Sequence, residues 1–195
     1  MLFQVAIRRG FLCFCLLGRI VTPVLGQDLV VGDSTSGNTT NISSGTNSFS
    51  STIVGNQAGA SNNQLNVFNT NTILTNSVDL IVGNQGSSNT LVISNGGSIV
   101  NQFGVLGQSP DSSNNSVLVT GTGSTWTNSS DLYVGRRGSS NSLVISNGAS
   151  TINQNAFIGY ILSSNNSVLV TGTNSAWSNS ANVYVGFFSE AATAW

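Results

Sequence analysis

From residue 27 onward the chain alternates short apolar runs with stretches of Ser, Thr, Asn and Gly. One kind of run reads LVIS, at residues 91–94, or VLVT, at residues 117–120. A second kind reads DLYVG, at residues 131–135, and closes on a glycine that can adopt a positive φ at a corner. The intervening SNG, TGTG and SSNN segments are typical of turns. No segment keeps a helical period, so the pattern predicts an all-β fold.

The strand that ends in glycine recurs along the whole chain. Its glycines are Gly32, Gly55, Gly83, Gly107, Gly135, Gly159 and Gly186. Their spacings are 23, 28, 24, 28, 24 and 27 residues, and each spacing contains about two recognisable strands. One such spacing suits one coil of a parallel β-helix, and roughly six to seven coils, about 4.8 Å apart, predict a rod roughly 30 Å long. A propeller is the alternative, but about three double units are too few to close its ring.

The first 26 residues have the plan of a secretory signal peptide. Arg8 and Arg9 precede an apolar run, and Val24-Leu25-Gly26 offers a cleavage site. The apolar run is too short to span a bilayer. We therefore expect residues 1–26 to be removed during export and residues 27–195 to form a β-solenoid repeat domain.

Composition limits the chemistry of this domain. Cys13 and Cys15 both lie in the predicted signal peptide, so we expect neither a disulfide nor a Cys-based metal site in the mature chain. His and Lys are absent, which excludes a Ser-His-Asp triad, its Ser-Lys variant and a Lys-containing phosphate loop. Without residues 1–26, two Arg face six acids, a net charge of 2 − 6 = −4. Nucleic acid is therefore not an expected partner, and we expect no cofactor.

Two long segments of the repeat carry a family resemblance. VLVTGTGSTWTNSSDLYVG, at residues 117–135, and VLVTGTNSAWSNSANVYVG, at residues 168–186, resemble the repeat of autotransporter passengers (the type V secretion and PEP-CTERM associated repeat). The resemblance implies a secreted or bacterial cell-surface β-helical stalk with a C-terminal outer-membrane barrel or anchor. The chain ends at Trp195 without either, so we expect the repeat domain to be incomplete at its C-terminus.

Acidic and basic residues offer few candidates for chemistry. One repeated position holds Asp28, Asp79, Asp131 and Asn182. This column is either a carboxylate ladder for a cation or for acid catalysis, or a series of turn caps, and the Asn favours turn caps. Arg136 and Arg137 replace Asn84 and Gln85 of the preceding unit, which favours a solvated loop over a catalytic pair.

Aromatic residues repeat at a fixed spacing of 51 residues. Trp126 recurs as Trp177, and Tyr133 recurs as Tyr184, while Leu74 occupies the first Trp's place. The Leu favours an apolar packing role. The alternative is an exposed row that stacks on sugar rings, which makes Trp126 and Trp177 candidate ligand-facing residues.

These patterns predict a non-enzymatic protein: an exported cell-surface stalk with a structural or adhesive role. Its expected partners are host or matrix carbohydrate or protein, and its uncapped last coil predicts self-association. A carbohydrate-acting enzyme on a β-helix is one alternative, for which Asp111, an off-register acid in the core of the repeats, is the candidate. A truncated, non-functional gene remnant is the other alternative.

Overall fold

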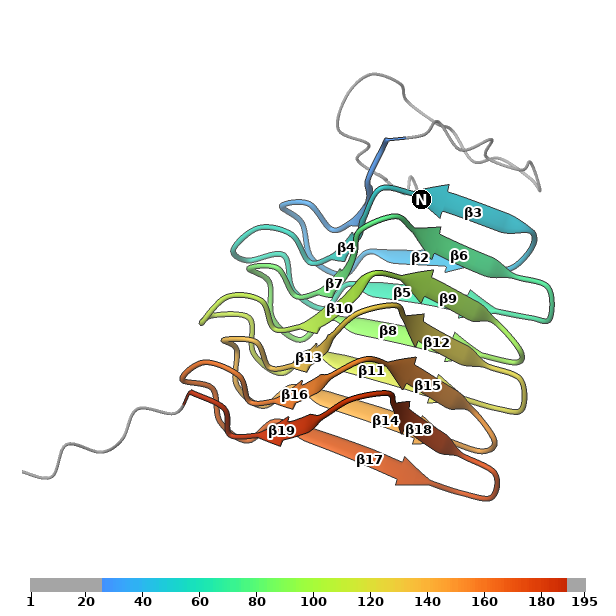
Figure 1. The fold of residues 1–195 in the computed structure, drawn as a ribbon. Coiled ribbons are helices and arrows are strands. Elements are labelled where there is room, and N and C mark those ends of the chain that lie inside the picture. The colour runs from blue at the N-terminus through green and yellow to red at the C-terminus, as the bar shows by residue number, and fades with distance from the viewer. Residues whose placement is uncertain (1–25, 189–195) are drawn as a thin grey trace, which may run out of the picture.

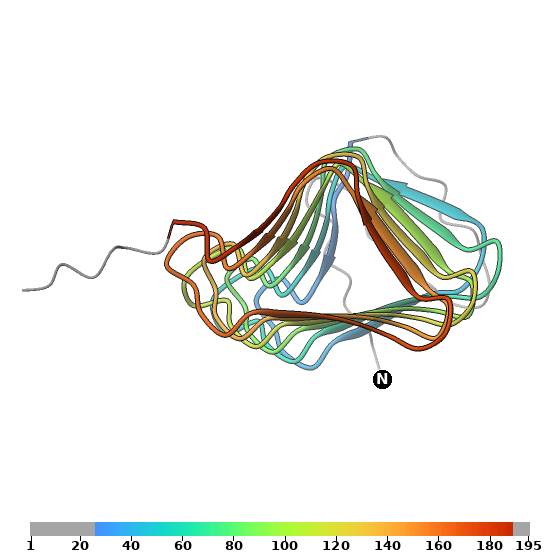
Figure 2. The same ribbon diagram turned by 60° about the horizontal axis from the view of Figure 1, so that its bottom comes forward.

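The structure, a computed structural model, describes residues 26–188 as a parallel β-solenoid of six complete coils. The described residues form 19 strands and no helix. The strands stack into three sheets that form the sides of a roughly triangular prism (Figure 1). Figure 2 shows this cross-section along with the loops that bulge from one of its corners. The predicted fold class is confirmed, whereas residues 1–25 of the predicted signal peptide lie outside the described residues.

Each coil contributes one strand to each sheet, and all neighbouring strands run parallel. Sheet A holds β1 (Leu29–Val31), β4 (Thr52–Val54), β7 (Asp79–Val82), β10 (Phe103–Leu106), β13 (Leu132–Val134), β16 (Ala156–Ile158) and β19 (Val183–Val185). Sheet B holds β2 (Thr39–Ile42), β5 (Gln64–Phe68), β8 (Thr90–Ser94), β11 (Ser116–Thr120), β14 (Ser142–Ser146) and β17 (Ser167–Thr171). Sheet C holds β3 (Thr46–Phe49), β6 (Ile73–Asn76), β9 (Ser98–Asn101), β12 (Thr125–Asn128), β15 (Ser150–Asn153) and β18 (Ala176–Asn179).

Each coil contains three strands. The expectation of about two strands per coil was wrong. The unexpected strands are those of sheet C, such as β12 with the sequence TWTN. Its two inward positions hold Trp126 and Asn128, so no alternation of apolar and polar residues marks it as a strand. The partner strands above and below supply the hydrogen bonds that keep these residues extended.

The core lies in the lumen of the solenoid. In sheet B, Val117 pairs with Leu91 on one side and Leu143 on the other, and all three side chains are buried. Leu132 and Val134 of sheet A are buried in the same core. Because each inward side chain packs mainly against the same position in adjacent coils, stability is summed coil by coil.

A ladder of asparagines runs from coil to coil along the corner that precedes sheet B. It consists of Asn38, Asn63, Asn89, Asn115, Asn141 and Asn166. The Oδ1 atom of Asn115 accepts hydrogen bonds from the backbone N and the Nδ2 of Asn89, at 2.9 and 3.1 Å. A Cβ on the corner Gly83, whose φ is +79°, would lie 2.2 Å from Nδ2 of Asn115. Corner glycines therefore provide both a left-handed turn and space for the ladder.

Candidate binding surface

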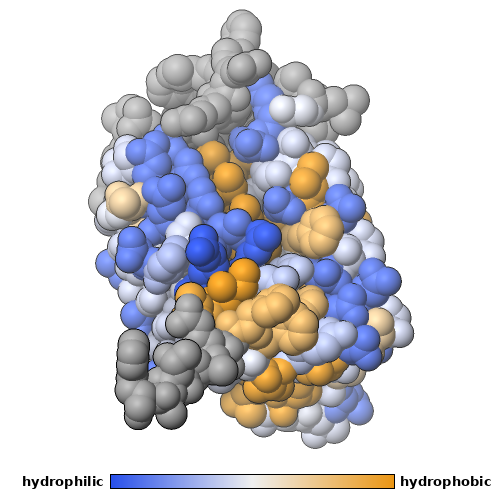
Figure 3. Space-filling model, turned by 60° about the vertical axis from the view of Figure 1, so that its left-hand side comes forward, coloured by the Kyte–Doolittle hydropathy of each residue, from blue (hydrophilic) through white to orange (hydrophobic). Residues whose placement is uncertain are grey.

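An unbroken apolar column runs along the outer face of sheet A. Its members stand two residues before each corner glycine and pair in register from strand to strand. We call this column the axial stripe; it consists of Val30, Ile53, Ile81, Val105, Tyr133, Phe157 and Tyr184. None of the seven belongs to the core cluster in the lumen. Figure 3 shows apolar side chains in a line between polar ones on this face, widening toward the C-terminal coils.

Two margins border the axial stripe. The strand margin lies two residues before the stripe and consists of Asp28, Ser51, Asp79, Phe103, Asp131, Asn155 and Asn182. The loop margin directly follows the corner glycines and consists of Asp33, Asn56, Asn84, Gln108, Arg136, Tyr160 and Phe187. Polar residues dominate both margins, except at Phe103 of the strand margin and where the loop margin becomes aromatic at its C-terminal end.

Hydrogen bonds between coils hold the margins in place. In the loop margin, Nδ2 of Asn84 donates to Oδ1 of Asn56 at 2.9 Å, and Nη1 of Arg136 donates to Oε1 of Gln108 at 3.1 Å. In the strand margin, Nδ2 of Asn155 donates to Oδ1 of Asp131 at 2.8 Å. The axial stripe therefore has polar edges in fixed positions.

The C-terminal part of the stripe is a stack of rings. The ring centroid of Phe157 lies 4.9 Å from that of Tyr133 and 4.9 Å from that of Tyr184, with planes nearly parallel. Tyr160 of the loop margin meets Tyr133 and Phe157 edge-on, and Phe187 stacks on Tyr160 with centroids 5.7 Å apart. Such stacking stabilises the last coils, and it leaves ring edges more accessible than ring faces.

Charges face one another across the stripe at Tyr133. The guanidinium carbon of Arg136 lies 5.4 Å from the centroid of the Tyr133 ring, and the Tyr133 hydroxyl donates to Oδ2 of Asp131 at 3.3 Å. Burial, followed by the charge and the hydrogen bond of Asp131, raises the pKa of Tyr133 to about 12 against the opposing effect of Arg136. Burial also raises the pKa of Asp79, while Arg136 lowers it.

Trp126 does not face a ligand, which corrects one of the two candidate site residues. Its side chain is 0% exposed in the lumen, and its Nε1 donates to Oδ1 of Asn101 at 2.8 Å. Trp177 also points inward: it packs against the core and donates to Oδ1 of Asn153 at 2.8 Å. It is half-buried because it lies in the last described coil. The inward direction follows from strand parity, which places both Trp side chains on the buried face of sheet C.

The predicted acidic column exists, but its carboxylates do not form a continuous ladder. Asp28, Asp79 and Asp131 occupy every second coil of the strand margin, with Ser51 and Phe103 between them. Asp28 accepts a hydrogen bond from the backbone N of Ser51 at 3.0 Å, which fits the expected turn cap. Residues 26–188 contain no group of three or more His, Cys, Asp or Glu side chains that could hold a metal ion.

The other charged candidates lie in the loops between sheets A and B. Arg137 and Asp111 are exposed. Arg136 is half-buried between Gln108 and Tyr133, so it is a fixed part of the loop margin rather than of a freely solvated loop.

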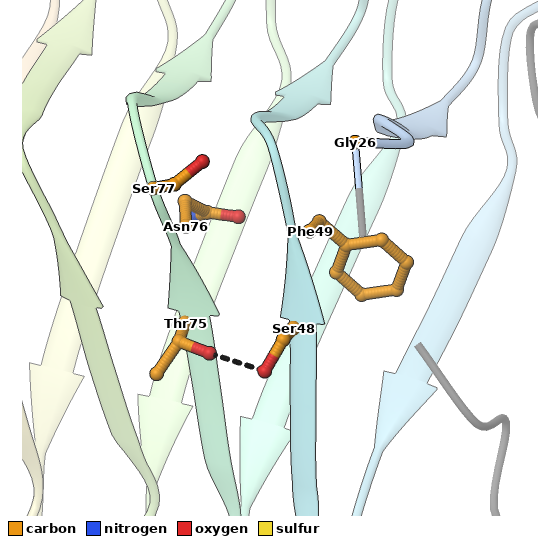
Figure 4. Close-up of a pocket in the computed structure, with 6 residues that line it drawn as sticks. All are labelled: Gly26, Ser48, Phe49, Thr75, Asn76 and Ser77. Atoms are coloured by element: carbon orange, nitrogen blue, oxygen red, sulfur yellow. Dashed lines mark hydrogen bonds between the residues drawn. The ribbon is translucent and has the colours of Figure 1, made fainter. Parts of the chain in front are cut away.

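A shallow hollow of about 190 Å³ opens beside the first coil (Figure 4). Its lining includes Phe49 and the hydrogen-bonded hydroxyls of Ser48 and Thr75, whose oxygens lie 2.7 Å apart. The lining contains no titratable group. The hollow therefore offers weaker recognition than the axial stripe.

The axial stripe does have a signal in the sequence, separate from the strand and turn patterns that predict the fold. The position two residues before every corner glycine is apolar or aromatic, from Val30 to Tyr184. In a strand whose neighbours at i ± 1 face the lumen, that position must face outward. Ile53, Ile81, Tyr133 and Tyr184 are half-buried and so available for contact, whereas the other three members of the stripe are buried.

The fold and this surface define the class of protein: a three-sheet parallel β-solenoid with an apolar stripe along one outer face. No family model matches the chain, and neither the curated proteins nor the solved structures contain a match. Within residues 26–188 there is no helix long and apolar enough to cross a membrane.

Proposed function

We propose that this chain is part of an exported β-solenoid stalk that acts at a bacterial cell surface by adhesion and not by catalysis. The observation that carries the proposal is the axial stripe, which continues through all seven strands of sheet A without a break. A repeated surface on a repeated scaffold provides many weak contacts at once, and such contacts sum to useful avidity.

The scaffold supports a role in display. Its three sheets keep the same register from coil to coil, so the lateral positions of the outward side chains are fixed along the whole axis. Buried ladders such as the one through Asn115 make each coil dependent on its neighbours. A rigid rod of this kind holds a binding face away from its point of attachment.

Hydrogen bonding favours binding over catalysis at the stripe. Asp131 accepts hydrogen bonds from the backbone N and Nδ2 of Asn155 and from the Tyr133 hydroxyl. Arg136 is held by Gln108 and lies over Tyr133. These groups have structural partners within the margin, as is typical of a preformed recognition surface.

Export and adhesion are tested separately on the whole chain carrying a C-terminal epitope tag in a Gram-negative host. Cleavage after Gly26, read by N-terminal sequencing, and loss of the tag to protease added to intact cells are the expected results for export to the surface. An uncleaved protein in the cytoplasm would refute export. Purified protein coupled to beads is expected to retain them on polysaccharide- or matrix-protein-coated wells better than uncoupled beads, and equal retention would refute adhesion.

A further inference from the structure

The geometry points to a neutral, linear polysaccharide as the ligand of the axial stripe, lying along the solenoid axis with its hydroxyls on the two margins. This inference rests on the proposed adhesive function and names its ligand class.

The cross-section of the surface matches that of an extended sugar chain. A chain of pyranose rings is a ribbon whose faces are lined by C–H groups and whose two edges carry hydroxyls. The stripe offers an apolar floor with half-buried, accessible side chains at Ile53, Ile81 and Tyr133. Val105 and Phe157 are buried, so contacts with a ligand are made at intervals along this floor. Polar groups stand on both sides of that floor: Asp131 on the strand margin and Arg136 on the loop margin. Hydroxyls at both edges of the ribbon would find acceptors on one side and donors on the other.

The length of the surface favours a polymer. The stripe passes from Val30 to Tyr184 through seven strands stacked at the β-sheet spacing of about 4.8 Å. Apart from Phe103, both margins are polar from the first coil as far as Asp131 and Arg136, so successive sugar units would meet successive coils along this part of the line. Phe157 lies between the rings of Tyr133 and Tyr184, and the guanidinium of Arg136 lies over the Tyr133 ring, so the sugar would contact ring edges and aliphatic side chains rather than stack on a free ring.

Charge selects a neutral polymer over an anionic one. Residues 26–188 contain five Asp and two Arg, so they have a formal charge of 2 − 5 = −3. The guanidinium of Arg136 lies over Tyr133 and lowers the pKa of Asp79, so its charge is partly balanced within the surface. An anionic polysaccharide would meet the carboxylates of Asp79 and Asp131 without a surplus of cations.

Sheet B provides an internal comparison. Its outer face also has a central apolar column, which includes Leu118 and Val144. The flanking residues there are short hydroxyl side chains that bond to one another between coils, such as Ser146 to Thr120 at 2.9 Å. From β8 to β17 that face has no charged or aromatic flank, so this part of sheet B serves as the control surface.

The test is affinity electrophoresis of the 27–195 protein through gels that contain xylan, mannan, mixed-linkage glucan or a soluble chitin derivative, with polygalacturonate as the anionic comparison. We expect at least one neutral polymer to retard the protein, and polygalacturonate to leave its mobility unchanged. Tyr133→Ser and Arg136→Gln are expected to weaken the retarding interaction about tenfold. Leu118→Ser, at the matching outward position of the same coil, is expected to stay within about twofold of the original protein.

Each result decides the ligand class. Absence of retardation by every neutral polymer, equal retardation by polygalacturonate, or equal effects of Tyr133→Ser and Leu118→Ser would overturn the inference. Circular dichroism melts of the three variants show whether a lost interaction reflects a lost fold, and Arg136→Gln changes the surface with the least loss of packing. Bead adhesion to matrix protein without polysaccharide binding would overturn this inference while leaving the proposed adhesive function intact.

Discussion

Two aromatic positions that repeat with the same spacing have opposite environments. Trp126 of β12 is buried in the lumen, whereas Tyr133 of β13, seven residues later, is half-buried on the outer face. The direction in which each side chain points decides its hydrogen-bond partner. The Trp126 indole donates to Asn101 inside the lumen, and the Tyr133 hydroxyl donates to Asp131 on the outer face. The role of an aromatic residue in this fold therefore depends on its parity within a strand.

Tyrosine ionisation tests the environment of Tyr133. Its pKa is raised to about 12 from the model-peptide value of 10.0, so the folded state holds the phenolic proton more tightly than the unfolded state does. Between these pH values the unfolded chain binds fewer protons, and stability is therefore expected to fall as pH rises from 10 toward 12. Absorbance titration is expected to show a tyrosine that ionises well above pH 10.

Three variants test whether the late titration belongs to Tyr133. Tyr133→Phe should remove it and flatten the loss of stability at high pH, while Tyr184→Phe should retain both. Asp131→Asn should lower the Tyr133 pKa, because the negative charge that opposes ionisation is gone. A late step that survives Tyr133→Phe would show that a different tyrosine has the raised pKa.

At the scale of elements, the coils are joined by side-chain ladders as well as by sheets. Asn115 accepts two hydrogen bonds from Asn89 and donates two to Asn141. Its side chain is 0% exposed, so water cannot replace these partners. The ladder supplies a buried polar connection at the corner where a bulging loop enters sheet B.

Asn115→Ala is expected to lower the free energy of unfolding by about 3 kcal/mol, because it leaves the buried donors of Asn89 without an acceptor. Its neighbour Asn114 is exposed and has a φ of +59°, a conformation that glycine adopts freely. Asn114→Gly is therefore the matched control, with an expected change below about 0.5 kcal/mol. Urea denaturation followed by circular dichroism measures both, and similar losses in the two variants would contradict a special role for the ladder.

At the scale of the whole molecule, the last described coil is open on one side. Val183 and Val185 are 47% and 76% exposed, although Leu132 and Val134 at the same positions two coils earlier are buried. The ladder also ends there, since the buried Nδ2 of Asn166 has no hydrogen-bond partner among the described residues. Strands β17, β18 and β19 each pair on one side only within the described sheets. The exposed apolar side chains and unpaired strand edges make this end prone to associate with another chain.

A polypeptide produced as residues 27–195 is therefore expected to self-associate at micromolar concentration. Val183→Lys combined with Val185→Lys should shift it toward monomers, because the added charges oppose burial of this end. Sedimentation velocity measures the change, with Val144→Lys on the outer face of sheet B as the control. A monomer before any substitution would contradict the expectation.

Much of the architecture could be predicted from particular residues. The spacing of Gly32 to Gly186 gave the coil length, and runs such as LVIS at residues 91–94 gave the strands of sheet B. Sheet C was missed because strands such as β15, with the sequence STIN, have no apolar alternation. The axial stripe was also missed, and Trp126 was considered for a surface on which it does not lie.

The sequence by itself determined the period, the corners and the all-β character, because glycine conformation and apolar alternation are local properties. Tertiary structure decided which face each side chain occupies and which distant residues become neighbours. Tyr133, Phe157 and Tyr184 are far apart along the chain, yet stacking of the coils puts them in contact. Closing each coil around a lumen fixes inside and outside at once, and that closure depends on hydrogen bonds to strands more than twenty residues away.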